Sequence, residues 1–260
     1  MSLSPFPLVV AVLAGCTEPP VLDPVTERLA EQVLEIAEPQ MRLMIGVSAI
    51  VAETCTVESL SGYTFTGEAA LALGVTQADV ETSESGGHTW TFAHVGIDAT
   101  DGTLVLTTDS ERTTVSLSYT ASNNTLVSGV YHVLSCDGPA VVPDTGDTAT
   151  DSGDTGATNE TAAAGAEGYT VNVSGNLDFE TVDGTNHLVI EGDKPYSALT
   201  WLPPTAIAPM AGWVHWMDQE TNPTEEITLE GAANIDYTTR TWPGKASGNR
   251  WARSITIGLP

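Results

Sequence analysis

An alternation of apolar and polar residues runs from Tyr169 to Glu180, with Val171, Val173 and Leu177 on one side of the pattern. Successive side chains of a β-strand point to opposite faces, so this period of two predicts a half-buried strand. A strand of about this length must pair with others to satisfy its backbone hydrogen bonds. The chain is therefore expected to build a sheet, and the remaining sequence decides how many strands it contains.

Further β-rich runs surround this segment, separated by turn-forming clusters of Gly, Asp, Ser and Asn. Connections this short force neighbouring strands to be antiparallel. We expect a mainly β fold of antiparallel meander sheets, arranged as a sandwich or a half-barrel. The predicted strands are Glu68–Leu73, His88–Ile97, Thr103–Thr108, Thr113–Tyr119, Leu126–Cys136, Leu188–Glu191, Ser197–Leu202, Trp213–Met217, Glu226–Glu230, Ile235–Arg240 and Trp251–Leu259.

An amphipathic helix is predicted before the strands. Asp23 is a suitable N-cap, and Pro24 suits the first helical position. Apolar residues then recur at helical spacing from Val25 to Ile36, a face that we expect to pack on the first sheet. Pro39 is expected to end or kink this helix. The apolar stretch Met41–Ala52 is either a second helix or a buried strand.

The N-terminus carries an apolar run from Phe6 to Ala14 that is too short to span a bilayer. It ends in Leu13-Ala14-Gly15-Cys16, which resembles the lipobox of bacterial lipoproteins. The resemblance covers residues 1–16 and implies cleavage before Cys16, whose sulfur and amine then carry lipid. The leader departs from the family pattern because no Lys or Arg precedes the run. Thr17, rather than Asp, follows the cysteine, which in such lipoproteins favours the outer membrane.

The chain contains three cysteines, an odd number for an exported protein. If Cys16 carries lipid, Cys55 and Cys136 remain to form a disulfide in an oxidising compartment. The alternative is two unrelated buried thiols. A bridge closing a loop of about 80 residues would contribute about 4.5 kcal/mol in the chain-entropy model.

Eight Lys and Arg against 34 Asp and Glu give a net charge of −26, which argues against a nucleic-acid partner. Residues 140–166 are rich in Asp, Thr, Gly and Ala and lack aromatic residues, so we expect a disordered acidic linker. Such linkers are similar to those of Gram-negative surface lipoproteins, and their carboxylates could bind calcium loosely. The predicted organisation is a signal peptide at 1–15, a lipidated tether at 16–22, a helix plus first β domain at 23–139, the linker at 140–166, and a second β domain at 167–260.

Five of the six tryptophans lie in the last 60 residues. They are either core residues or a platform on which sugar rings stack, with Arg250 as a hydrogen-bonding partner. The candidate platform residues are Trp213, Trp216, Trp242 and Trp251.

Two other groups could bind a metal. His88 and His94 share one face of an alternating strand, and His132 would complete a three-histidine zinc site if all three point inward. The alternative is that the imidazoles are spaced along a sheet, at its rim or hydrogen-bonded within it, and bind no metal. Oxygen ligands at Asn176, Asp178, Glu180 and Asp183 could bridge calcium, but a solvated polar face explains them better.

These features predict a lipid-anchored cell-envelope protein without enzymatic activity or cofactor, which presents a β domain for adhesion or for binding a glycan or an envelope protein. No Walker loop, dinucleotide fingerprint or zinc-protease motif occurs. The alternative is a periplasm-facing carrier of a lipid or other apolar ligand. In that case the sheet would form a half-barrel with a helical lid, similar to periplasmic lipid or lipoprotein carriers.

Overall fold

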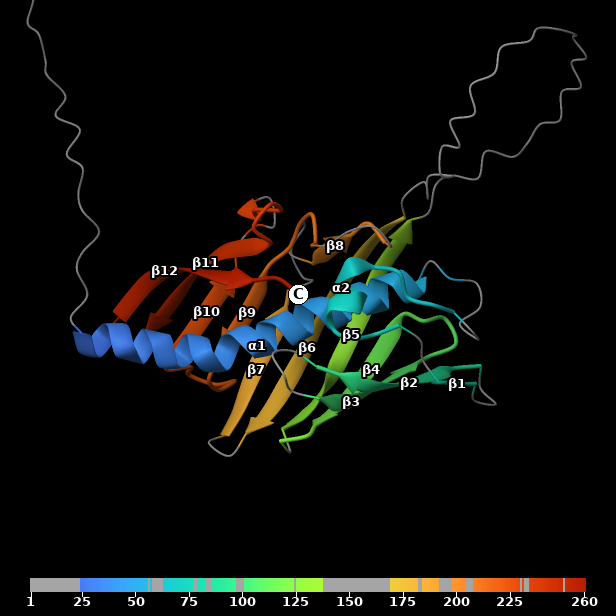
Figure 1. Cartoon of the computed structure of the whole chain (residues 1–260), viewed down its shortest axis with the longest axis horizontal. Helices are drawn as coiled ribbons and strands as arrows, with labels where there is room; N and C mark the ends of the chain where they lie inside the picture. Colours follow the sequence, from blue (N-terminus) through green and yellow to red (C-terminus); the bar gives the residue numbers. More distant parts are fainter. Residues whose placement is uncertain are drawn as a thin grey trace, which may run out of the picture.

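The computed structural model describes residues 24–55, 57, 63–76, 79–82, 86–96, 101–123, 125–137, 169–181, 184–191, 198–203, 208–229, 231, 234–249 and 251–260. The predicted signal peptide, Cys16 with its tether, the acidic linker and Arg250 lie outside the described residues. Within them, one long helix lies across one large β-sheet (Figure 1).

The long helix α1 (Pro24–Cys55) contains 32 residues and continues through Pro39. The expected end of the helix at this proline is therefore wrong, and the undecided stretch Met41–Ala52 is helical. A proline inside a helix costs about 3 kcal/mol. Ala37 and Met41, on either side of it, are both buried, and burying one large apolar side chain contributes about 1.5–3 kcal/mol. Continuous burial against the sheet outweighs the missing backbone hydrogen bond.

The described strands form a single antiparallel sheet, which confirms the prediction of a mainly β fold with an N-terminal helix. The order is β1-β2-β3-β4-β5-β6-β7-β9-β10-β11-β12, with β8 paired to β6 outside this path. Strands β1 and β12 are therefore the two edge strands of this path. Because there is one sheet and not two, the sandwich alternative is not formed. The strands are β1 (Asp79–Thr82), β2 (His88–Val95), β3 (Gly102–Thr108), β4 (Thr114–Ala121), β5 (Leu126–Asp137), β6 (Thr170–Thr181), β7 (Gly184–Ile190), β8 (Leu199–Trp201), β9 (Val214–Met217), β10 (Glu225–Leu229), β11 (Thr241–Gly248) and β12 (Trp251–Gly258).

The two β regions that were predicted as separate domains are joined through β5 and β6. These strands pair along nearly their whole length, from Leu126 opposite Glu180 to Asp137 opposite Thr170. Gly129 lies in this pairing where a Cβ would be 2.1 Å from the carbonyl oxygen of the facing strand. Buried residues of both halves belong to one hydrophobic core. The described parts of 23–139 and 167–260, which were predicted as two β domains, therefore supply two parts of one sheet.

Three local predictions also differ from the structure. The segment predicted as strand Glu68–Leu73 forms the short helix α2 (Glu68–Ala72), in keeping with the high helix propensity of Ala and Leu. The predicted strand Ile235–Arg240 is mostly turn. Strand β11 was missed because Pro243 and Gly244 interrupt its pattern. Pro243 is tolerated because it lies just beyond the last residue paired with β10.

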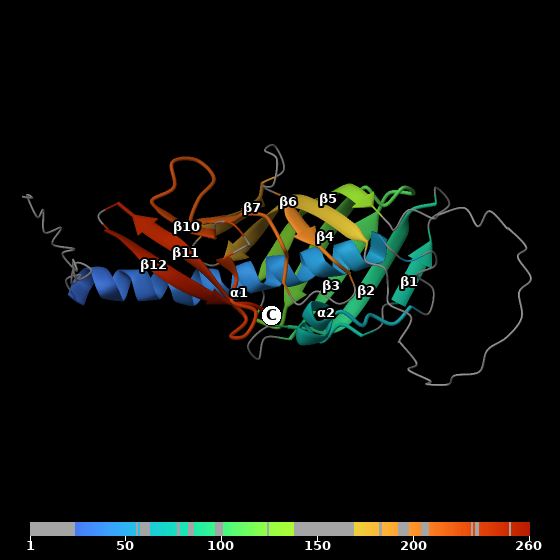
Figure 2. The same cartoon turned by 90° about the horizontal axis from the view of Figure 1, so that it is seen from above.

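Helix α1 runs along the length of the sheet (Figure 2), and specific contacts fasten it there. The indole Nε1 of Trp201 in β8 donates a 3.2 Å hydrogen bond to the hydroxyl of Ser48, and both groups are buried. At the C-terminal end of α1, Cys55 forms a disulfide with Cys136 of β5, as predicted, with the two Cα atoms 6.3 Å apart. The helix is thus attached to the sheet both along its length and at its C-terminal end.

Candidate ligand-binding pocket

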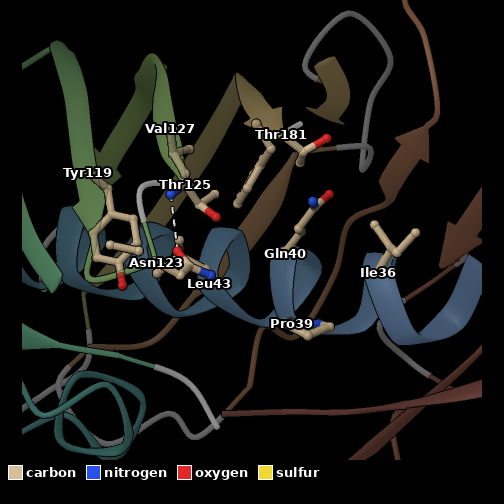
Figure 3. A pocket seen from close by; sticks show the side chains of 11 residues that line it. Ile36, Pro39, Gln40, Leu43, Tyr119, Asn123, Thr125, Val127 and Thr181 are labelled. Carbon is tan, nitrogen blue, oxygen red and sulfur yellow. Dashed lines mark hydrogen bonds between the residues drawn. The ribbon is translucent and has the colours of Figure 1, made fainter. Parts of the chain in front are cut away.

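A pocket of about 260 Å³ lies between α1 and the part of the sheet formed by β4, β5 and β6 (Figure 3). Its depth is formed by buried side chains, most of them apolar. These come from the helix and from three neighbouring strands: Gln40, Leu43, Tyr119, Ala121, Val127 and Phe179.

The rim of the pocket has two different sides. Ile36 and Pro39 of α1 form an apolar side. On the sheet side, the Asn123 carboxamide oxygen accepts a 3.0 Å hydrogen bond from the backbone N–H of Thr125 (Figure 3), and the Thr181 hydroxyl is also at the rim. Among the described residues that line the pocket, none is Lys, Arg, Asp or Glu. The pocket therefore offers an uncharged, mostly apolar interior with an uncharged polar margin.

Gln40 is the one polar side chain in the depth of the pocket, and it is 92 % buried, given its exposed fraction of 8 %. Its Oε1 accepts hydrogen bonds from the indole Nε1 of Trp216 at 2.7 Å and from Nδ2 of Asn186 at 3.3 Å. An indole N–H can only donate, so the amide atom facing Trp216 must be oxygen. The Nε2 group is consequently the other end of the amide, and no described residue accepts a hydrogen bond from it. Trp216 does not line the pocket whereas Gln40 does, so this N–H₂ group is on the pocket side.

Tyr119 contributes a large part of the wall from β4. Its hydroxyl donates a 3.1 Å hydrogen bond to the backbone carbonyl of Val95. Burial, and secondarily the negative charge of Asp101, raise the pKa of the Tyr119 phenol. The phenol is therefore neutral at physiological pH, and the wall carries no charge.

An exposed apolar stripe on α1 leads to the pocket. Val25, Leu29 and Ile36 are 69 %, 43 % and 49 % exposed and lie on one side of the helix. Of the apolar stripe that was expected to pack on the sheet, Ala30, Val33 and Ala37 are buried, whereas Val25, Leu29 and Ile36 stay exposed. Ile36 belongs both to the stripe and to the rim of the pocket.

The structure does not form the predicted tryptophan platform. Trp216, Trp242 and Trp251 are buried in the core, and only Trp213 of the four, at 36 % exposure, reaches the surface. They are buried because their strands turn them toward the covered face of the sheet, as the burial patterns of β9, β11 and β12 show. The proposed partner Arg250 lies outside the described residues.

The three candidate metal-binding histidines are not brought together. The pairing of β2 with β3 shifts between Phe92 and Val95, and His94 has a positive φ of 60° in this irregularity. His94 therefore leaves the face that it was expected to share with His88 and points outward, where its Nδ1 lies 2.9 Å from the Asp101 carboxylate. His132 is exposed on β5. Within the described part of the chain, no three His, Cys, Asp or Glu side chains are placed to hold a metal ion.

The predicted oxygen-ligand group lies on the opposite face of β6 from the core. Asn176 and Glu180 are exposed there, and the Asp178 carboxylate lies 2.7 Å from Nδ1 of His187 on β7. Asp183 lies outside the described residues. Asp178 thus faces a neighbouring side chain across the strand pair.

The pocket residues were not predicted as a site. Tyr119, Val127 and Phe179 have the alternating pattern of ordinary core residues, and the pocket arises only where α1 crosses their strands. Gln40 gave the single signal in the sequence: it is a polar residue at the start of the long apolar stretch that follows Pro39.

The described chain contains no helix that combines the length and the apolar character needed to cross a membrane. The chain as a whole matches no protein-family model, no curated protein and no solved structure.

Proposed function

We propose that this chain is a lipid-anchored envelope protein that binds the apolar part of a lipid or of another apolar molecule in the pocket between α1 and β4–β6. The observation that carries the proposal is the pocket itself, which is about 260 Å³ in volume and largely apolar in its depth. The lipobox-like motif ending at Cys16 supports the anchor. The proposal requires no catalytic group.

The size of the pocket supports a ligand rather than a packing defect. An apolar cavity of about 150 Å³ is already enough to bind benzene. The present pocket is larger and approaches the lower limit of about 300 Å³ for small-molecule sites. It can therefore hold a short alkyl segment or a ring, with the remainder of a longer molecule lying along the rim.

Contacts on both sides of the pocket support a site that is formed before the ligand arrives. On one side, a carboxylate oxygen of Glu38 accepts a 3.1 Å hydrogen bond from the backbone N–H of Gly258. On the other side, the hydroxyl of Tyr131 donates a 2.9 Å hydrogen bond to the carbonyl of Met44. These ties prevent α1 from moving inward to fill the space, so a ligand would not have to open the site at its own energetic cost.

Glycan binding gains no support from the tryptophans, because stacking on sugars requires exposed rings and three of the four candidate tryptophans are buried. The exposed stripe on α1 instead favours the carrier alternative. It places Ile36 at the rim of the pocket and Leu29 about two turns away on the same side of the helix, where an alkyl chain too long for the pocket could remain in apolar contact.

The test is binding of the neutral fluorescent probe N-phenyl-1-naphthylamine to the full chain. Val127→Phe fills the pocket and is expected to weaken binding at least about tenfold, equivalent to about 1.4 kcal/mol. Leu126→Phe is the matched control, since Leu126 is the neighbouring residue on the exposed face of β5, and it should bind the probe normally. Equal binding by both variants would exclude the pocket as the site.

The anchor is tested separately by mass spectrometry of the mature protein expressed in a Gram-negative host. We expect a chain that begins at an acylated Cys16. A mature protein that retains Met1 and carries no lipid would contradict the anchor but leave the pocket unaffected.

A further inference from the structure

The N–H₂ group that Gln40 presents to the pocket restricts the kind of ligand that the pocket can accept. The carboxamide oxygen is occupied by Trp216 and Asn186, and Nε2 has no acceptor among the described residues. A hydrocarbon that fills the pocket would exclude water from this N–H group and leave it without an acceptor, at a cost of about 1–3 kcal/mol. An oxygen atom of a bound molecule would remove this cost, whereas a plain hydrocarbon would not.

The charges around the pocket indicate which oxygen is suitable. A carboxylate or phosphate taken into a largely apolar site needs a cation or several donors to offset the loss of its hydration. None of the described residues that line the pocket is Lys or Arg, and Arg42, the nearest cation in the sequence, is not one of them. The chain as a whole carries a net charge of −26, which disfavours the approach of an anion.

We infer that the ligand is an uncharged amphiphile in which an alkyl chain carries a neutral oxygen acceptor, such as an ester, and that Gln40 Nε2 donates a hydrogen bond to this oxygen. The inference rests on the proposed function of the pocket and adds the chemical class of the ligand. In this arrangement Gln40 is a specificity-determining residue. Trp216 is a positioning residue, because its indole fixes which end of the Gln40 amide faces the ligand.

The experiment compares decanoate with methyl decanoate, which share the same alkyl chain, as competitors for N-phenyl-1-naphthylamine on the full chain at pH 7. The methyl ester is expected to displace the probe at a concentration at least about tenfold lower than decanoate, a difference of about 1.4 kcal/mol. Equal or tighter binding of decanoate would overturn the inference while leaving the proposed function intact. Displacement by neither compound, together with no binding of the probe, would overturn both.

The role of Gln40 is tested by Gln40→Met, which keeps the size of the side chain and removes the donor. Affinity for methyl decanoate is expected to fall about three- to tenfold, the effect of one neutral hydrogen bond, with affinity for decanoate unchanged. Ser48→Ala is the matched control, because it also removes the acceptor of a buried indole, that of Trp201, without touching the pocket.

A second variant covers the case in which Gln40→Met does not fold. Gln40→Glu keeps an oxygen toward Trp216, and its carboxyl can donate to the ester only while it is protonated, so affinity for the ester should fall when the pH is raised until this carboxyl ionises. Unchanged affinity for methyl decanoate in a folded Gln40→Met protein, or in a Gln40→Glu protein whose carboxyl is ionised, would overturn the role of Gln40.

Discussion

The indole Nε1 of Trp216 donates a 2.7 Å hydrogen bond to the side-chain oxygen of Gln40, which lies 176 residues earlier in the chain. This bond joins β9 to the middle of α1. Trp201 makes the same kind of bond with Ser48, which lies eight residues after Gln40 in the same helix. Two of the clustered tryptophans thus serve as attachments between the sheet and the helix.

The contribution of the Trp216–Gln40 bond can be measured by a double-mutant cycle. Gln40→Met leaves the buried indole N–H without an acceptor and is expected to lower the free energy of unfolding by about 1–3 kcal/mol. In the Trp216→Phe background the same substitution should cost less, because no donor remains to be satisfied. Urea unfolding of the four proteins gives the coupling energy, expected at about 0.5–1.5 kcal/mol. Strictly additive effects would show that the bond contributes nothing.

The carboxylate of Glu53 organises the segment that follows α1. It is buried and accepts hydrogen bonds from the hydroxyl of Tyr63 at 2.7 Å and from the backbone N–H groups of Thr66 and Gly67 at 3.0 and 3.3 Å. Glu53→Gln replaces one acceptor oxygen by a donor, so we expect a loss of about 1.5–3 kcal/mol in chemical denaturation. Glu31→Gln, on the exposed side of α1, should stay within about 0.5 kcal/mol of the wild type.

The Cys55–Cys136 disulfide closes a sequence separation of 81 residues. The chain-entropy model gives about 4.5 kcal/mol for a loop of this length, and measured losses on removal are about 2–5 kcal/mol. The double variant Cys55→Ser and Cys136→Ser should therefore unfold at clearly lower urea concentration. Peptide mapping without reductant should recover the two cysteines in one linked peptide pair. A linkage of either one to Cys16 would contradict the pairing.

The pairing of β5 with β6 predicts the behaviour of a cleaved chain. A protease site inserted between Asp144 and Gly165 should yield two fragments that elute as a single species in size-exclusion chromatography under native, reducing conditions. They stay together because the cut leaves the β5–β6 hydrogen bonds and the shared core in place. Separation into two folded fragments would instead support the two-domain organisation suggested by the sequence.

Three tyrosines make stability depend on alkaline pH. Burial raises the pKa of Tyr131, and burial with the nearby Glu53 carboxylate raises that of Tyr63. The pKa of Tyr119 is raised as well. The folded state keeps these protons above pH 10, where unfolded tyrosines lose theirs, so stability is full below about pH 10 and falls as pH rises further. The phenolate absorbance that comes from these three tyrosines should therefore appear together with unfolding. Complete titration of all tyrosines in the folded protein near pH 10 would contradict this.

The local sequence pattern was sufficient to predict most of the strands and the disulfide. The alternation of Val171, Val173 and Leu177 predicted β6, because burial on one face of a strand imposes a period of two. Two cysteines left over after Cys16 predicted the Cys55–Cys136 bridge. Pattern failed where a neighbouring element decided the outcome. Pro39 lies inside a helix because the sheet buries residues on both sides of it.

The pocket is a clearer example of a feature that local sequence pattern does not predict. Tyr119 and Phe179 are apolar members of ordinary strand patterns, and nothing in their immediate sequence distinguishes a residue that lines a cavity from one that fills the core. Whether such a side chain meets another side chain or empty space depends on how α1 crosses the sheet, and that crossing is fixed by contacts between residues far apart in the chain, such as Glu38 with Gly258.

The sequence by itself determined the class of the fold, because apolar periodicity and turn residues act over a few neighbouring positions. Only the tertiary structure decided that the two β regions form one sheet, that the tryptophans are buried and that Gln40 presents a donor to an apolar pocket. These outcomes depend on the direction in which each side chain points once distant segments have packed, and no local pattern contains that information.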